Sequence, residues 1–163
     1  MKLIWIKLDN ANAHDAGRQL LKDLYRETTG QNLPPIEKTP QGKPFFADSP
    51  WHFSISHTKR HVFCVLSQKE VGLDAEEMDR EVNLSLADKI LSAPERREYD
   101  VAPDKRKALL TFWVLKEAQA KFTAEGIRGY PNKTVFSLSD PRVSIRDGCL
   151  VAIIEDKEKP HAL

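Results

Sequence analysis

The segment Val71-Gly-Leu-Asp-Ala-Glu76 carries two acids two residues apart. If this segment is a strand, its period of two places Gly72, Asp74 and Glu76 on one face and the apolar residues on the other. Carboxylates held roughly 6–7 Å apart repel each other unless a cation lies between them, and hard oxygen ligands suit Mg²⁺ better than zinc. A solvated strand edge is the alternative, because charged residues continue to Arg80.

The segment from Phe112 to Lys121 supplies a third acid. Helical spacing places Trp113, Glu117 and Lys121 in one stripe at i, i+4 and i+8, with Lys116 beside it. One carboxylate would then lie near two ammonium groups that can neutralise phosphate. The alternative is an ordinary surface ion pair, because Glu117 followed by Lys121 is the favourable i, i+4 order.

Two shorter motifs could hold an anion. Gly42-Lys-Pro44 predicts a rigid turn that presents Lys43. Phe53-Ser-Ile-Ser-His57 predicts a strand whose end presents the hydroxyl of Ser56 and the imidazole of His57. Together these groups are suited to a phosphate.

Other kinds of site are disfavoured. The spacing of His52, His57 and His61 fits no standard zinc arrangement, and no cysteine or carboxylate stands at ligand spacing with them. The sequence has no Gly-x-Ser-x-Gly elbow, no Walker A loop and no Gly-x-Gly-x-x-Gly turn.

The composition is typical of one soluble protein unit with its own core, with 163 residues of which 40% are hydrophobic and 30% charged. A net charge of +1 argues against nucleic acid as a partner. No apolar segment approaches the ~20 residues of a membrane span, and the first strand is too short for a signal sequence, so we expect a cytoplasmic protein without a membrane partner. Cys64 and Cys149 lie in apolar runs, which predicts buried thiols rather than a disulfide.

The elements that must position these side chains follow from hydrophobic periodicity and capping signals. We expect a loop over 31–41 and helices over 15–28, from Ser85, from Ser92, and from Pro103 to before Gly126. Strands are expected over 3–8, 43–46, 51–56, 62–67, 71–76, 135–139, 143–146 and 149–155. The order predicts an α+β fold of two similar subdomains, residues 1–69 and 70–163, each a small sheet packed against a helix.

Taken together, Gly42-Lys-Pro44, Phe53-Ser-Ile-Ser-His57, Val71-Gly-Leu-Asp-Ala-Glu76 and Trp113-Val-Leu-Lys-Glu-Ala-Gln-Ala-Lys121 resemble the 4′-phosphopantetheinyl transferase superfamily. They match its larger, pseudo-dimeric branch, and Glu125-Gly-Ile127 is similar to the turn that follows the family's long helix. The resemblance implies mainly antiparallel sheets and transfer of phosphopantetheine from coenzyme A to a serine of an apo acyl or peptidyl carrier protein, with release of 3′,5′-ADP.

The resemblance also implies roles for particular residues. Asp74, Glu76 and Glu117 would be Mg²⁺ ligands, and Asp74, Glu117 and Lys121 would act in catalysis, with Glu117 or a water held by it as the base. His57 would lie nearest the 3′-phosphate. Glu95 is similar to a family site acid, but it also fits a capping box with Ser92. The residues expected to contact coenzyme A are Lys43, Pro44, Ser56, His57, Lys116 and Lys121.

The sequence departs from the family in its first part. The stretch ahead of Gly42 is shorter, and the helix from Asp15 lacks the His-Arg-x-x-Leu pattern, so Arg18, Lys22 and Arg26 remain alternatives at the adenine end. We expect a monomer, since the chain supplies its own first half. A Mg²⁺-dependent phosphate-ester hydrolase and a binding protein without turnover are the competing functions, and the carrier and the choice between Mg²⁺ and Mn²⁺ stay open.

Overall fold

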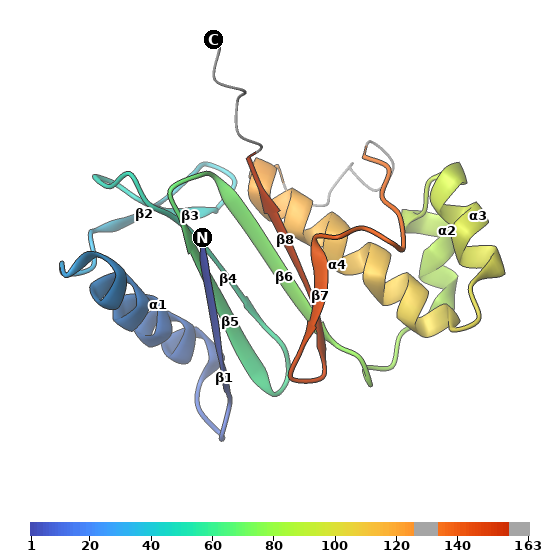
Figure 1. The fold of residues 1–163 in the computed structure, drawn as a ribbon, viewed down its shortest axis with the longest axis horizontal. Coiled ribbons are helices and arrows are strands. Elements are labelled where there is room, and N and C mark those ends of the chain that lie inside the picture. The colour runs from blue at the N-terminus through green and yellow to red at the C-terminus, as the bar shows by residue number, and fades with distance from the viewer. Residues whose placement is uncertain (126–133, 157–163) are drawn as a thin grey trace, which may run out of the picture.

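The computed structural model describes residues 1–125 and 134–156 (Figure 1). They form a mixed α/β protein of small antiparallel sheets and helices, as the sequence predicted. None of the described helices is long and apolar enough to cross a membrane. The predicted turn at Gly126 and Ile127 lies outside the described residues.

The first half is a three-stranded antiparallel sheet covered by one helix. Strands β1 (Lys2–Lys7), β4 (His52–His57) and β5 (His61–Ser67) pair in the order β1-β5-β4, so the strand that is apolar on both faces is central, as predicted. Helix α1 (Ala13–Thr29) follows β1. The helix buries one apolar stripe against the sheet, comprising Leu20, Leu21, Leu24 and Tyr25.

A small hairpin interrupts the segment predicted as a loop. Strand β2 (Ile36–Lys38) pairs with β3 (Pro44–Phe46), so the prediction of a loop over 31–41 was wrong for three residues. The turn between the two strands places Gly42 at φ +92°, a conformation that glycine adopts readily. Because β2 is short and flanked by prolines, only its pairing partner reveals it as a strand.

The second half repeats the topology of the first. Strands β6 (Val71–Glu77), β7 (Val143–Arg146) and β8 (Cys149–Glu155) pair antiparallel in the order β6-β8-β7, and helix α4 (Lys105–Thr123) packs on them. In both halves a strand is followed by helical structure and a hairpin whose second strand pairs with the first strand. The short helical elements ahead of α4 are η1 (Leu84–Leu86), α2 (Ala87–Ile90) and α3 (Ala93–Val101).

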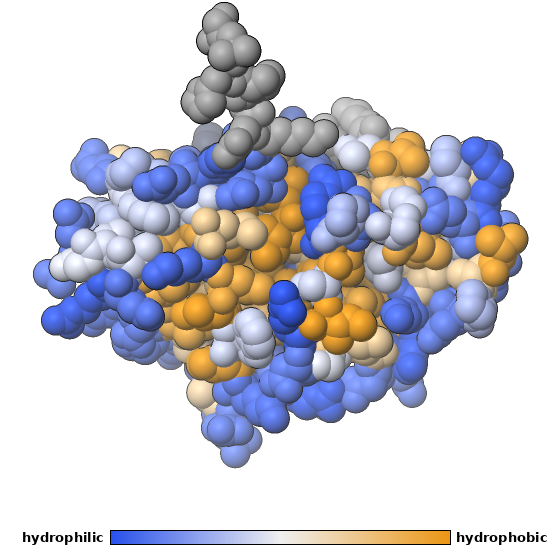
Figure 2. Space-filling model, viewed as in Figure 1, coloured by the Kyte–Doolittle hydropathy of each residue, from blue (hydrophilic) through white to orange (hydrophobic). Residues whose placement is uncertain are grey.

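The layers follow the order α1, first sheet, second sheet, α4 (Figure 1). The inner faces of the sheets meet in an inter-sheet cluster of Phe63, Val65, Val71, Leu73, Ala75, Cys149 and Val151. Figure 2 shows apolar side chains gathered on the face that presents β1 and β7. The exposed Trp5 of β1 stacks on the buried Phe63 of β5. Cys64 and Cys149 are free and buried, as predicted, and burial raises the pKa of Cys64 to about 12.

Three local predictions need correction. Helix α4 begins at Lys105 rather than at Pro103, because the side chain of Asp104 caps it by accepting a hydrogen bond from the Lys107 N–H. Asn83 instead of Ser85 caps the first short turn, by accepting a hydrogen bond from the Ser85 N–H. The segment 135–139 is not a strand, because carboxylates of α3 take up its backbone N–H groups.

Candidate active site

Close contact between β6 and α4 builds the site. The alternation predicted for β6 is confirmed: Val71, Leu73 and Ala75 enter the inter-sheet cluster, and Gly72 faces α4. A Cβ atom on Gly72 would lie 2.1 Å from the carbonyl oxygen of Ala118. The helix backbone therefore rests directly on the strand, which brings the side chains at 117 and 121 next to Asp74.

Asp74 is the most tightly enclosed of the predicted ligands, with 7% of its surface exposed. Its Oδ1 accepts hydrogen bonds from Lys121 Nζ at 2.9 Å and from Ser56 Oγ at 3.1 Å, while Oδ2 is buried and has no hydrogen-bond partner within the described residues. Burial raises the pKa of Asp74 above its ordinary value, against the opposing charge of Lys121. This carboxylate is poorly satisfied by the protein alone.

The other two acids share the electrostatic environment of Asp74. Burial and the charge of Asp74 raise the pKa of Glu117 to about 7, with Glu76 adding to the effect and Lys121 opposing it. Glu76 accepts a hydrogen bond from Trp113 Nε1 at 3.2 Å and forms an ion pair with Arg80. The three carboxylates thus concentrate negative charge at one junction of β6 and α4.

The three acids are candidate ligands for a divalent cation. Within residues 1–125 and 134–156, no three potential ligands lie close enough to hold a metal as the side chains stand. The ligand set Asp74, Glu76 and Glu117 therefore stays a prediction. The partnerless oxygen of Asp74, the raised pKa of Glu117 and the hard oxygen donors all fit a cation of the Mg²⁺ type.

Several of the predicted residues line two clefts. A lysine cleft of about 320 Å³ is lined by Lys43, Pro44, Ser54, Glu117 and Lys121 among others. A histidine cleft of about 730 Å³ is lined by His57, Lys59, Arg60, Glu76, Glu77 and Arg80 among others. The acids Glu76 and Glu117 thus line different clefts.

Lys43 lies in the lysine cleft but its ammonium group is already engaged. It forms an ion pair with Glu70 and donates to the carbonyl oxygen of Phe122 at 3.2 Å. The loop at Gly42 is thereby attached both to the start of β6 and to the end of α4. A phosphate contact by Lys43 requires this ammonium group to exchange or share these partners.

Ser56 has partners other than the predicted phosphate. Its buried hydroxyl donates to Asp74 and accepts from the Ala75 N–H at 3.2 Å, and Ser54 Oγ accepts from the Leu73 N–H at 3.0 Å. Serine side chains of β4 therefore satisfy the free edge of β6 in place of a backbone ladder. Ser56 holds Asp74 in position rather than facing an open cleft.

Lys116 is buried on another side of α4. Its Nζ lies 2.9 Å from Glu95 Oε2, and successive helix residues point about 100° apart, so Lys116 does not share the stripe of Lys121. Its predicted contact with coenzyme A is not supported by this placement. Glu95 has no exposed surface; it completes the capping box with Ser92 and accepts from the Phe136 N–H at 3.0 Å, which favours its structural role.

The structure gives separate surroundings to the three histidines at positions 52, 57 and 61. His52 pairs with Glu70 at 3.1 Å, His61 pairs with Asp147 at 2.9 Å, and His57 lines the histidine cleft. The sequence reasoning missed the indole bond from Trp113 to Glu76, although the spacing of Trp113 and Glu117 on one helix stripe pointed toward it.

Comparison with known proteins identifies the class. Residues 70–161 match the model of the 4′-phosphopantetheinyl transferase superfamily, and the chain belongs to this superfamily. It is 30% identical over 113 residues to the 4′-phosphopantetheinyl transferase psf-1 of Bacillus pumilus, which covers 68% of this chain and 47% of that protein. It is 29% identical over 124 residues to the 4′-phosphopantetheinyl transferase Sfp of Bacillus subtilis (strain 168), covering 69% and 54% respectively. The chain thus spans about half the length of these curated relatives.

Proposed function

We propose that this chain transfers the 4′-phosphopantetheine group of coenzyme A to a serine of an apo acyl or peptidyl carrier protein. The observation that carries the proposal is the placement of Lys121 Nζ 2.9 Å from Asp74, beside a glutamate, Glu117, whose pKa is raised to about 7. Membership of the superfamily and the likeness to relatives named 4′-phosphopantetheinyl transferase support it.

The reaction is a displacement at phosphorus. The carrier serine oxygen bonds to the phosphorus atom that bears pantetheine, the bond from that phosphorus to the bridging oxygen breaks, and 3′,5′-ADP leaves. Glu117, or a water it holds, accepts the serine proton. The ammonium group of Lys121 offsets the charge that develops on the leaving phosphate.

A divalent cation fits this proposal. Asp74, Glu76 and Glu117 would hold Mg²⁺ through their carboxylate oxygens. When bound, Mg²⁺ supplies positive charge to the pyrophosphate. The protein's own share is to hold the three acids together, with Ser56 fixing Asp74 and Trp113 fixing Glu76.

The remaining contacts with coenzyme A follow from the two clefts. Lys43 and Pro44 of the lysine cleft would lie along the pyrophosphate side, and His57 in the histidine cleft would bind the 3′-phosphate. The candidates for contacts with the adenine end are Arg18, Lys22 and Arg26. The matching topology of the halves supports a pseudo-dimer of residues 1–69 and 70–163. The chain would act as a monomer in the cytoplasm.

Mass spectrometry of a carrier protein tests this function. The chain is incubated with coenzyme A, Mg²⁺ and a panel of apo carriers, and a carrier that gains the mass of phosphopantetheine supports transfer. Release of inorganic phosphate without a modified carrier indicates hydrolysis instead. Binding of coenzyme A with no modified carrier in the panel indicates a binding protein. Asp74→Ala and Glu117→Ala should abolish transfer while leaving the protein folded.

A further inference from the structure

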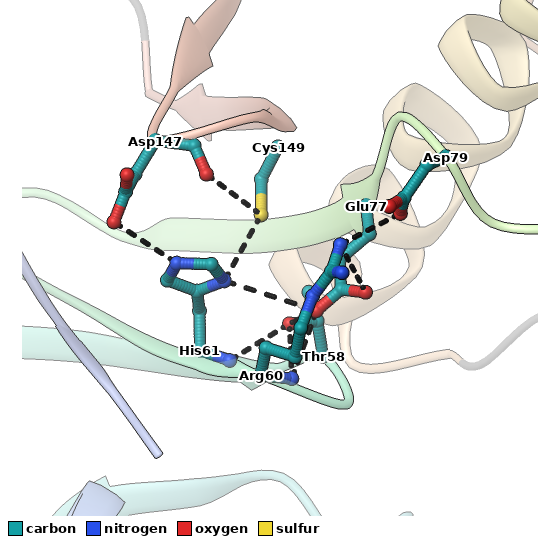
Figure 3. A network of polar contacts seen from close by, with 7 residues as sticks. All are labelled: Thr58, Arg60, His61, Glu77, Asp79, Asp147 and Cys149. Atoms are coloured by element: carbon teal, nitrogen blue, oxygen red, sulfur yellow. Dashed lines mark hydrogen bonds and ion pairs between the residues drawn. The ribbon is translucent and has the colours of Figure 1, made fainter. Parts of the chain in front are cut away.

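The carboxylate of Glu77 anchors the turn between β4 and β5 to the end of β6. Glu77 follows the predicted ligand Glu76, is only 7% exposed and points to the opposite face of the strand. Its Oε1 accepts from Arg60 N at 2.8 Å and from Thr58 Oγ1 at 2.9 Å, and its Oε2 lies 3.0 Å from the Arg60 guanidinium (Figure 3). Burial acts to raise the pKa of Glu77, but these hydrogen bonds outweigh it and hold the pKa below its ordinary value.

The same turn is held by further contacts from the second half. The Arg60 guanidinium also donates to the exposed Asp79 at 2.7 Å. His61, which begins β5, lies 2.9 Å from Asp147 through Nε2 and 3.5 Å from Cys149 Sγ through Nδ1 (Figure 3). Figure 3 shows Glu77 at the centre of this network, where its carboxylate meets both Thr58 and Arg60.

The anchored turn forms one wall of the histidine cleft. His57, Thr58 and Arg60 line that wall, and Glu76 and Glu77 line the opposing one, so the two walls come from different halves of the molecule. His57 is the last residue of β4 and stands directly before the anchored turn. The spacing between His57 and Glu76 therefore depends on the bonds that Glu77 makes across the cleft.

We propose that Glu77 is a positioning residue that fixes His57 for the 3′-phosphate of coenzyme A. This inference rests on the proposed function. Glu77 touches neither the reacting phosphorus nor the serine in this scheme; it acts through the turn. Its loss should therefore weaken recognition of the 3′-phosphate more than it lowers the maximal rate.

The test compares coenzyme A with dephospho-coenzyme A, which lacks the 3′-phosphate, as substrates of wild type, Glu77→Ala and Glu77→Gln. In wild type the kcat/KM for coenzyme A should exceed that for dephospho-coenzyme A. Glu77→Ala should reduce this ratio about tenfold, the loss expected for a charge-assisted hydrogen bond network. Glu77→Gln keeps an oxygen acceptor for Thr58 and the Arg60 N–H, so it should retain more of the ratio.

A matched control separates positioning from general stability. Glu98 also accepts a backbone N–H, from Leu138 at 2.8 Å, but it does not line the histidine cleft. Glu98→Ala should lower Tm and leave the substrate ratio unchanged. If Glu77→Ala does not fold, Glu77→Gln carries the comparison.

The possible outcomes distinguish failure of the positioning role of Glu77 from failure of the proposed transferase function. A wild-type ratio that persists in both Glu77 variants overturns the positioning role and leaves the transferase function standing. A wild-type chain that modifies no carrier with either substrate overturns the proposed function itself. A ratio that falls in the Glu77 variants with kcat for coenzyme A largely kept supports the inference.

Discussion

Replacing Glu117 with glutamine should make the metal-free protein more stable at alkaline pH. Burial and the charge of Asp74 raise the pKa of Glu117 from 4.5 to about 7 in the folded protein. Above pH 7 the folded state therefore carries an unfavourable charge, and this penalty fades as the pH falls from the folded pKa toward the unfolded one. Glutamine has nearly the same shape and no charge.

The size of the effect follows from the pKa. One pKa unit corresponds to about 1.4 kcal/mol, so the full difference between 4.5 and about 7 sets an upper limit of about 3 kcal/mol. Glu117 is only partly buried, and solvent screening reduces this to about 1–2 kcal/mol. For a protein of this length, such a gain raises Tm by roughly 3–6 °C.

Thermal unfolding followed by circular dichroism, with a chelator present, measures this gain. The Tm of Glu117→Gln should exceed that of wild type at about pH 8.5 and should be close to that of wild type at about pH 5. The exposed Glu81→Gln is the matched control and should change little at either pH. Added Mg²⁺ should then stabilise wild type and not Glu117→Gln. An alkaline Tm for Glu117→Gln at or below that of wild type would refute the crowding of carboxylates inferred here.

Three further substitutions test the supports of the site. Gly72→Ala should lower the free energy of unfolding by about 3 kcal/mol in a urea titration, because the new Cβ atom would clash with the Ala118 carbonyl oxygen. An unchanged midpoint of unfolding would contradict the packing of α4 on β6. Glu95→Ala should cost about 3–5 kcal/mol in the same titration, since it removes the buried pair with Lys116. Lys121→Ala should reduce kcat about 10²-fold or more in the carrier assay with the fold intact, and near-normal turnover would exclude its role at the leaving phosphate.

The sequence predicted the fold well where periodicity was strong. The alternation in Val71–Glu77 and the doubly apolar run of β5 led to the correct elements because both strands are well buried. The same logic failed at 135–139, where Phe136 and Leu138 alternate as in a strand and pack on the core of the second half. Their backbone N–H groups donate hydrogen bonds to carboxylates of α3 rather than to a neighbouring strand. The local sequence pattern does not predict a partner so distant along the chain.

The candidate site was predictable only in part. The strand period predicted the face of β6 that carries Asp74, and the helix period predicted the face of α4 that carries Glu117 and Lys121. Both predictions hold, because the direction of each side chain depends only on its own strand or helix. The partners of Lys116 and Ser56 depend on what packs against α4 and β4, which spacing along one element does not reveal. The sequence did not single out Glu77 for the same reason. It lies in a run of charged residues, and only its contact with the β4–β5 turn distinguishes it from a solvent-exposed acid.

The repeated topology offers two places at which the proposed site could form. Exchanging the two halves would map β4 and β6 onto β7 and β1, so a symmetric pair would have two equivalent junctions. At the first, Ser54 and Ser56 of β4 bond to the edge of β6 beside Asp74. The strands of the second junction carry exposed apolar side chains, including Trp5 and Ile145. Because β6 carries Asp74 and Glu76 while its counterpart β1 carries no acid, the proposed function would use one junction rather than two.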